Sequence, residues 1–265
     1  MSTGFHVVVC GSLVPDLLQT LEPVQGPAGP GLRNELMLPS VLDPWAAHAL
    51  YEAGHLAATV PGTMVWLVSL GPKAKLQQLM MSIAQKVPFE FVAIDASASG
   101  FTDPVEVAAA LADAIEMIPA LDRSRLLLFG GCASASRDAG VTVQLVGERL
   151  GIADQFLAVD ELTVSAQGTL TILERVEGGK YLVSEVAGPP CAIAWATGNR
   201  PEPPNNPQIG MLNMRTIMPA LQKARLVQRS APGTTFHGVE LPKQERRTRI
   251  VKDVPIEEMA MEIAN

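Results

Sequence analysis

Along the first 150 residues, short apolar runs alternate with longer segments in which apolar side chains recur at helical spacing. Four runs predict strands: 5–10, 63–69, 89–94 and 126–130. The first is continuous, apolar and β-branched, which is typical of a strand covered on both faces. The segments of helical spacing are 44–57, 72–85, 104–118 and 138–150. Two of them begin with Asp-Pro, which supplies an N-cap and a proline suited to the first turn. This order predicts an α/β fold with a doubly wound, mostly parallel sheet.

Beyond Gly151 the predicted strands become shorter and are separated by turns that contain glycine. Two hairpin turns, at 166–168 and 177–179, connect strands predicted at 162–165, 169–174 and 181–186. A last apolar run, 191–197, completes what we expect to be an antiparallel extension. The polar stretch 225–265 ends in a short helix, 256–263, and lacks the apolar content to fold alone. We therefore expect an α/β domain over 1–224 and a C-terminal arm that packs on this domain or on a partner.

A proline-rich stretch follows the last predicted strand, with five prolines between Pro201 and Pro219. Because proline cannot donate a backbone hydrogen bond, we expect an ordered loop without regular helix until about Asn213. Exposed apolar side chains on such a loop are unfavourable unless a partner covers them. The side chains concerned are Ile209, Met211, Leu212 and Met214. The alternative, a long connection without function, is uncommon in compact domains.

Composition narrows the class of protein. The chain has 265 residues, of which 48% are hydrophobic, so it can bury a full core. Its net charge of −7 argues against a nucleic-acid partner, although the segment 222–252 is basic. Three widely spaced cysteines predict neither a disulfide framework nor a zinc site, and they fit the cytoplasm. No apolar run approaches the ~20 residues of a membrane span, and the start lacks the basic region of a signal peptide.

Small residues follow three of the predicted strands, at 10–12, 69–72 and 130–140. In an open parallel sheet, ligands bind beyond the carboxyl ends of the strands. The longest stretch, Gly-Gly-Cys-Ala-Ser-Ala-Ser-Arg-Asp-Ala-Gly, leads into a helix whose free N–H groups favour a phosphate, and Arg137 adds a possible charge-assisted bond. A flexible turn before an ordinary helix is the alternative. We find no nucleophile elbow, acid–base pair or metal cluster, so we expect no catalytic residues.

Several motifs together resemble the beta subunit of electron transfer flavoproteins. Residues 42–53 are similar to the family's Met-Asn-Pro-Phe segment, Ser-Leu-Gly-Pro at 69–72 to its Ser-x-Gly-Pro, and residues 174–179 to its Arg-Glu-Val-Glu-Gly-Gly hairpin. Residues 127–130 match the strand that ends in glycine. The proline-rich stretch and residues 216–223 resemble the family's Asn-Glu-Pro-Arg-Tyr and Ile-Met-Lys-Ala-Lys-Lys. The likeness extends from Val7 to about Ala224.

The resemblance implies a heterodimer that carries electrons from a flavin-dependent dehydrogenase, with an adenine nucleotide hydrolase-like, Rossmann-like fold. FAD would be held mainly by the alpha subunit, whose FAD pocket this chain would help to shape, and the arm 225–265 would pack on that subunit. AMP would bind here, at Cys10, Gly11, Asp43, Pro44, Trp45, Leu70, Gly130, Gly131, Ala133, Ser134, Ser136, Arg137, Asp138, Ala139, Gly140, Val141 and Thr142. Dehydrogenase docking would fall near 198–218, on Arg200, Glu202, Ile209, Met211, Leu212 and Met214.

The phosphate loop departs from the family, because Cys132, Ala133, Ala135 and Arg137 replace its glutamine and acidic positions. Two alternatives therefore stay open. In the first, a bifurcating type, this subunit binds a second FAD. In the second, the chain is a stand-alone enzyme that cleaves ATP at the α-phosphate, although it lacks the Ser-Gly-Gly-x-Asp-Ser type of loop.

Overall fold

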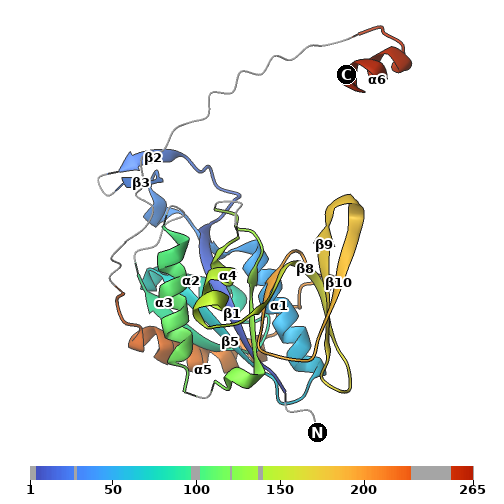
Figure 1. Ribbon diagram of the computed structural model, residues 1–265. Coiled ribbons are helices and arrows are strands. Elements are labelled where there is room, and N and C mark those ends of the chain that lie inside the picture. The colour runs from blue at the N-terminus through green and yellow to red at the C-terminus, as the bar shows by residue number, and fades with distance from the viewer. Residues whose placement is uncertain are drawn as a thin grey trace.

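The computed structural model describes residues 4–26, 29–96, 102–119, 121–136, 140–227 and 252–264. Within them, nine strands form one sheet (Figure 1): β1 (His6–Pro15), β4 (Ser40–Leu42), β5 (Met64–Gly71), β6 (Glu90–Asp95), β7 (Leu126–Gly131), β8 (Asp154–Val164), β9 (Leu170–Val176), β10 (Lys180–Val186) and β11 (Cys191–Trp195). Their order is β10-β9-β8-β11-β7-β1-β5-β6, and β4 pairs with β1. Strands β6, β5, β1, β7, β11 and β8 run parallel to one another. Strand β9 runs antiparallel to both of its neighbours, β8 and β10. The predicted fold class is confirmed.

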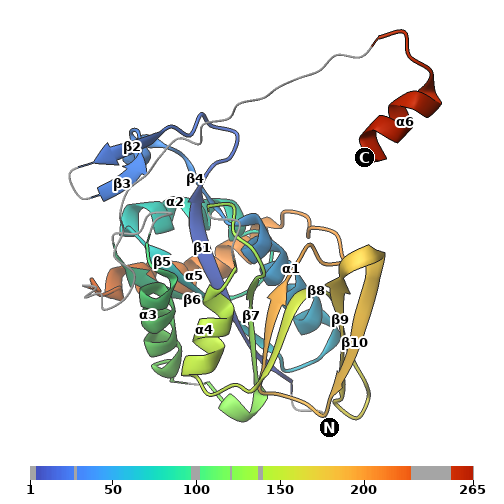
Figure 2. The same cartoon turned by 45° about the horizontal axis from the view of Figure 1, so that its top comes forward.

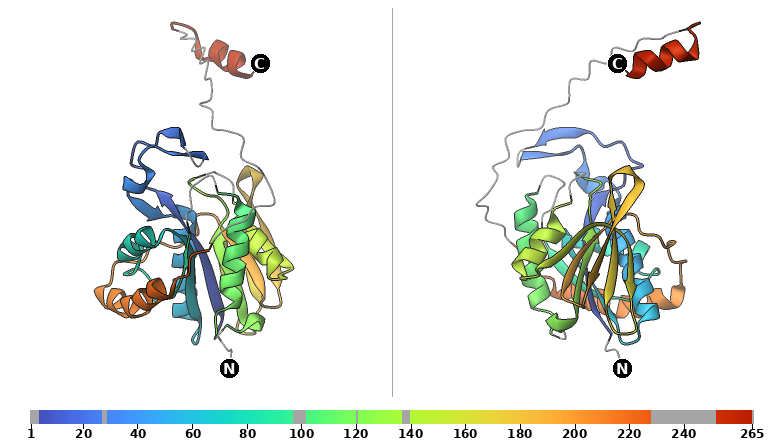
Figure 3. Two further views of the ribbon diagram at one scale, coloured as in Figure 1. Left: turned by 90° about the vertical axis from the view of Figure 1, so that its left-hand side faces the viewer. Right: turned by 45° about the vertical axis from the view of Figure 1, so that its right-hand side comes forward.

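Helices cover both faces of the sheet (Figure 3). On one face lie α1 (Pro44–Thr59), α2 (Lys73–Ile83) and α5 (Pro207–Lys223), and on the other α3 (Pro104–Glu116) and α4 (Thr142–Arg149). Alternate residues of β1 supply the two cores: Val7 and Val9 pack with α1 and α2, whereas Val8 and Cys10 pack with α3 and α4. This division follows from the period of two along a strand, and it explains why residues 7–10 of β1 are all apolar.

The remaining elements are short. Strands β2 (Pro23–Gly26) and β3 (Gly29–Leu32) form a separate hairpin between β1 and β4 (Figure 2), followed by the 3-10 turn η1 (Glu35–Met37). Two further 3-10 turns are η2 (Arg123–Arg125) and η3 (Glu177–Gly179), and α6 (Ile256–Ala264) lies near the C-terminus. No helix among the described residues is both long and apolar enough to cross a membrane.

The strand predicted at 191–197 was assigned to the wrong part of the sheet. It is β11, which ends at Trp195 and lies between β7 and β8, parallel to both. A run of five buried residues suits a central parallel strand, and only the pairing partners distinguish it from a buried antiparallel one. The two hairpins predicted before it, β8–β9 and β9–β10, are confirmed.

Two helix boundaries also differ from prediction. Helix α5 begins at Pro207 and not near Asn213, because the Asn206 side chain caps its Gln208 N–H at 2.9 Å and proline fits the first turn. Pro219 lies within this helix. Helix α4 begins at Thr142, whereas we expected it to begin at about 138. Arg137, Asp138 and Ala139 lie outside the described residues.

The chain remains on the α/β domain a little beyond α5. Leu226 forms a parallel bridge with Asp95 at the end of β6, and the Val227 N–H donates to the Asp95 carbonyl at 2.8 Å. Val227 also packs against the core on the α3 side. The basic segment noted in the sequence lies mostly outside the described residues.

Candidate functional site

A cavity of about 180 Å³ lies at the carboxyl ends of the central strands, where ligands bind in open parallel sheets. Its floor comes from the ends of β1 and β5, and its sides come from α1, α3, the loop after β7 and the start of α4. The predicted residues that line it are Cys10, Gly11, Asp43, Leu70, Gly131, Ala133, Ser134, Ser136, Gly140, Val141 and Thr142. Asp43 and Ser134, which are 91 positions apart in the sequence, meet here because parallel strands end at the same edge of the sheet.

Asp43 connects α1 to the loop after β7. Its side chain is 1% exposed; Oδ1 accepts the Trp45 N–H at 3.1 Å, and Oδ2 accepts the Ala135 N–H at 3.0 Å and the Ser134 hydroxyl at 2.8 Å. Burial raises the pKa of Asp43 above its usual value, although the hydrogen bonds from Ser134, Ala135 and Trp45 oppose this shift. The N-cap predicted from Asp-Pro is therefore present, and the same carboxylate also holds the loop.

The start of α4 faces the same cavity. Its N-cap, Val141, has no side chain that can accept a hydrogen bond, and among the described residues no side chain caps this helix end. The first N–H groups of a helix have no intrahelical partner and carry a partial positive charge. Because Gly140, Val141 and Thr142 line the cavity, these donors make this side of it suited to an anionic group.

Three residues predicted to touch a nucleotide support the described cavity wall without lining it. Trp45 packs against Gly131, where an added Cβ would lie 2.5 Å from the Trp45 Cβ, and Pro44 begins α1. At Gly130 an added Cβ would lie 2.3 Å from a methyl group of Val143. These contacts require glycine at both positions, which keeps β7 close to α1 and α4.

Sequence reasoning missed part of the cavity wall, namely Leu13, Ala46, Thr102, Pro104, Val107, Leu111 and Val143. Several belong to α3, whose Asp-Pro start follows β6, so its position at the ligand edge could have been inferred from the alternation of strands and helices. Cys10 is buried, and this burial raises the pKa of its thiol to about 12, which makes it a neutral apolar wall and not a nucleophile. Among the described residues no cluster of His, Cys, Asp or Glu fits a metal ion.

The proline segment, which we define as 198–206, is held firmly against α1 and the end of α2. Glu202 forms an ion pair with Lys86 at 2.5 Å, and this hydrogen bond from Lys86 lowers the pKa of Glu202. Arg200 lies 3.9 Å from the buried Glu52, and the Pro201 carbonyl lies 3.2 Å from a ring nitrogen of His55. Arg200 and Glu202, predicted to contact a partner, therefore both pair within the chain.

Helix α5 carries an exposed apolar face directly after the proline segment. Met211, Leu212, Met214 and Met218 are exposed, whereas Ile209 is half-buried, contrary to our expectation. The buried Asn213 holds the opposite face of α5: it accepts the Phe89 N–H and donates to two carbonyl groups at the end of α2. The helix is thus fixed, and its methionines face outward.

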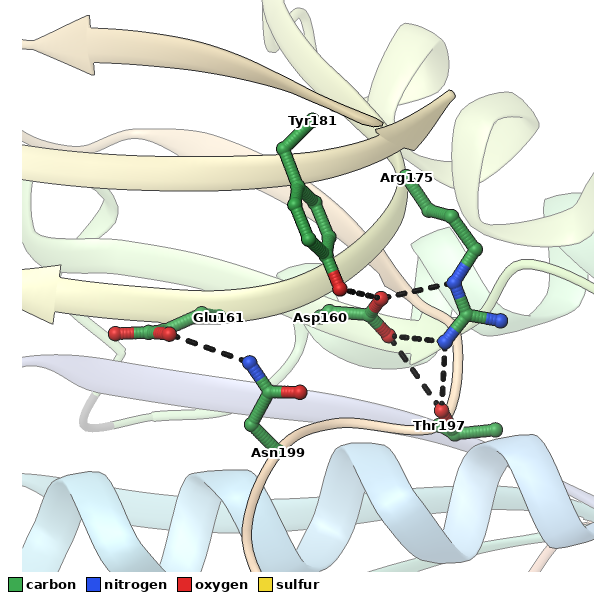
Figure 4. Close-up of polar contacts among 6 residues, drawn as sticks. All are labelled: Asp160, Glu161, Arg175, Tyr181, Thr197 and Asn199. Atoms are coloured by element: carbon green, nitrogen blue, oxygen red, sulfur yellow. Dashed lines mark hydrogen bonds and ion pairs between the residues drawn. The ribbon is translucent and has the colours of Figure 1, made fainter. Parts of the chain in front are cut away.

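The hairpin β9–β10 is fixed by a polar cluster, which we call the hairpin cluster: Asp160, Arg175, Tyr181 and Thr197 (Figure 4). Arg175 binds the Asp160 carboxylate through Nε at 2.9 Å and a terminal nitrogen at 2.8 Å, and Tyr181 donates to the same carboxylate at 3.1 Å. Arg175 also donates to the Thr197 hydroxyl at 2.9 Å. The sequence pattern did not predict this cluster, because its members come from β8, β9, β10 and the turn after β11.

Beside this cluster, apolar side chains of the edge strand β10 are exposed on both faces: Tyr181, Leu182 and Val183. The outer edge of β10 has no neighbouring strand in the described sheet. An exposed apolar edge with unpaired backbone groups is a surface that a second chain can extend or cover.

The family model for the electron transfer flavoprotein domain matches residues 34–224, which include the proline segment, α5, the hairpin cluster and the cavity residues from Asp43 onward. The chain belongs to the electron transfer flavoprotein family. Members of this family carry electrons and bind flavin and AMP in general, and they work in association with electron transfer partners. A search of curated proteins gave no match.

Proposed function

We propose that this chain is the beta subunit of a heterodimeric electron transfer flavoprotein, acting in the cytoplasm. It would bind AMP in its cavity and complete the pocket of an FAD held mainly by the alpha subunit. The observation that carries the proposal is that the family match spans the cavity residues from Asp43 onward, the β9–β10 hairpin and α5 together. Electron transfer between flavins needs proximity and a suitable environment, which a subunit without catalytic residues can provide.

The cavity fits AMP in its chemistry. The uncapped start of α4 supplies backbone donors for a phosphate, and apolar side chains such as Leu70, Val107 and Leu111 supply a surface for a base. Its volume of about 180 Å³ is below the ~300 Å³ at the lower end for small-molecule sites. The described walls would therefore enclose part of the nucleotide and leave the rest at the mouth.

The edge strand β10 is our candidate contact with the alpha subunit. Leu182 and Val183 are 54% and 59% exposed, and burying such side chains contributes ~25 cal/mol per Å² of apolar surface. Arginine and tyrosine, both present in the adjacent hairpin cluster, are among the residue types enriched at the energetically dominant positions of interfaces.

The outward face of α5 is our candidate contact with a dehydrogenase. Unbranched, polarisable methionine side chains adapt to differently shaped partner surfaces, and Met211 is 65% exposed. Because the ion pairs of the proline segment hold the start of α5 in place, little ordering entropy would be lost on docking.

Isolation of the tagged full chain from its native cells tests the proposal. We expect a one-to-one complex with a second subunit, an oxidised flavin spectrum, and AMP after acid release of the bound nucleotides. A monomer that carries neither flavin nor adenylate would refute it. Two FAD per complex and no AMP would favour the bifurcating type instead, and release of pyrophosphate from ATP by the isolated chain would favour the hydrolase alternative.

Two matched variants separate the proposed surfaces. Val183→Asp places a charge on the edge of β10 and should abolish recovery of the second subunit. Met211→Asp makes a comparable change on α5; it should leave the flavin-containing complex intact and slow flavin reduction by dehydrogenases in a native cell extract. Loss of the second subunit in the Met211→Asp variant alone would show that the two surfaces are assigned wrongly.

A further inference from the structure

We propose that the Ser136 hydroxyl presents a hydrogen-bond acceptor to the cavity, so that the ligand is selected for a hydroxyl or amino donor at this wall. The inference rests on the proposed nucleotide site and goes beyond it, because it assigns a role to one side chain. It follows from the direction of two consecutive hydrogen bonds, which join Ser134 to Asp43 and Ser136 to Ser134.

The first bond has a fixed direction. Ser134 Oγ lies 2.8 Å from Oδ2 of Asp43, and an ionised carboxylate can only accept. Although burial raises the pKa of Asp43, each of its two carboxylate oxygens accepts a backbone N–H, Oδ1 from Trp45 at 3.1 Å and Oδ2 from Ala135 at 3.0 Å, which favours the ionised form. The single hydroxyl proton of Ser134 therefore points to Asp43.

The second bond is then also fixed. Ser134 Oγ and Ser136 Oγ are 2.9 Å apart, a distance at which either could donate. Because the Ser134 proton is already used, Ser136 must donate its own proton to Ser134. The Ser136 backbone N–H also donates to Ser134 Oγ, at 3.3 Å.

Ser136 is left with lone pairs and no free hydroxyl proton. It is exposed and lines the cavity, so a ligand meets an acceptor at this wall. The start of α4 on the same cavity presents donors instead. The cavity therefore has one side for an anionic group and another for a donor. A nucleotide carries both, since its phosphate accepts while its ribose hydroxyls and its 6-amino group donate.

Calorimetric titration of the full chain tests whether Ser136 accepts a hydrogen bond from the ligand. The ligands are AMP, its 2′-deoxy and 3′-deoxy analogues, and purine riboside 5′-monophosphate, which lacks the amino group. Wild type should bind one of the three analogues roughly three- to tenfold more weakly than AMP, as expected for one lost hydrogen bond. In Ser136→Ala this preference should disappear, because the acceptor is gone. The analogue affected identifies the donor as a hydroxyl or the amino group.

A matched control is Ser124→Ala. The Ser124 hydroxyl donates to the Asp122 carboxylate at 2.7 Å, so the same kind of bond is removed before β7, at the opposite end of that strand from the cavity. This variant should keep the wild-type preference. If wild type and Ser136→Ala discriminate among the ligands equally, or if wild type does not discriminate, the acceptor role of Ser136 is wrong while the nucleotide site stands. If AMP binds neither the chain nor its complex, the nucleotide site itself is wrong, and this role falls with it.

Discussion

The ion pair between Arg175 and Asp160 in the hairpin cluster tests how burial changes the contribution of an ion pair to the stability of the fold. Arg175 and Arg33 each approach a carboxylate to 2.8 Å, but the Asp160 side chain is 1% exposed whereas that of Glu22 is 52% exposed. The variants Arg175→Met and Arg33→Met remove the same group and keep much of the aliphatic stem. Any difference between them therefore reports the surroundings of the carboxylate.

The expected cost differs in size between the two variants. Removing one partner of a buried ion pair lowers the free energy of unfolding by about 3–5 kcal/mol, because the remaining charge is buried without a compensating charge. Arg175 is half exposed and Asp160 keeps its bond from Tyr181, so we expect about 2–3 kcal/mol for Arg175→Met. For Arg33→Met we expect between ~0 and ~1 kcal/mol, as for other exposed pairs.

Urea unfolding of the full chain measures both values. With a slope of roughly 2–3 kcal/mol/M, the midpoint should fall by about 1 M in Arg175→Met and by much less in Arg33→Met. Arg175→Lys keeps the charge but loses the bidentate geometry, so it should fall between Arg175→Met and wild type. Equal losses in the two methionine variants, with unchanged slopes, would refute the reasoning from burial.

Three further changes test other parts of the structure. Gly131→Ala brings a Cβ within 2.5 Å of the Trp45 Cβ, so the free energy of unfolding should fall by about 1–3 kcal/mol in the same urea assay; an unchanged midpoint would contradict this contact. Asn213→Ala removes three buried hydrogen bonds and should cost about 2–4 kcal/mol, with faster hydrogen exchange in α5; exchange that is faster elsewhere but not in α5 would argue against its anchoring role. Burial raises the pKa of Cys10 and Cys191 to about 12, so iodoacetamide at pH 8 should modify them only in urea. Since these thiols titrate near 9.0 in the unfolded chain, the unfolded chain binds fewer protons than the folded chain above that pH. The free energy of unfolding should therefore fall as pH rises from about 9 towards about 12, and a constant free energy of unfolding over this range would contradict the raised pKa values.

Much of the fold was predictable because its signals are local. The apolar runs identified β1, β5, β6 and β7, and the Asp-Pro pairs located the starts of α1 and α3. A similar local signal was overlooked at α5, where Asn206 is the N-cap and Pro207 is the first helical residue. Counting prolines as helix breakers obscured it, although proline is favoured in the first turn of a helix.

The candidate site was predictable only in outline. Small residues after the strands pointed to the carboxyl edge, because parallel strands end together there. The sequence could not tell that Arg200 and Glu202 pair within the chain, since their partners, Glu52 and Lys86, lie more than a hundred positions away. Nor could it show the direction of the hydroxyl bonds that begin at Asp43.

The sequence alone determined the main alternation of strands and helices from β1 to α4 and the edge of the sheet where a ligand would bind, because capping and periodicity act over a few residues. It did not predict β2, β3, β4 or residues 154–161 of β8. Tertiary structure decided that β11 lies at the centre of the sheet, which methionines of α5 face outward, and which polar groups meet. These outcomes depend on contacts such as that of Asn213 with Phe89, 124 positions apart. Such pairings are selected by packing and hydrogen bonding of the whole chain, and a local pattern is compatible with more than one of them.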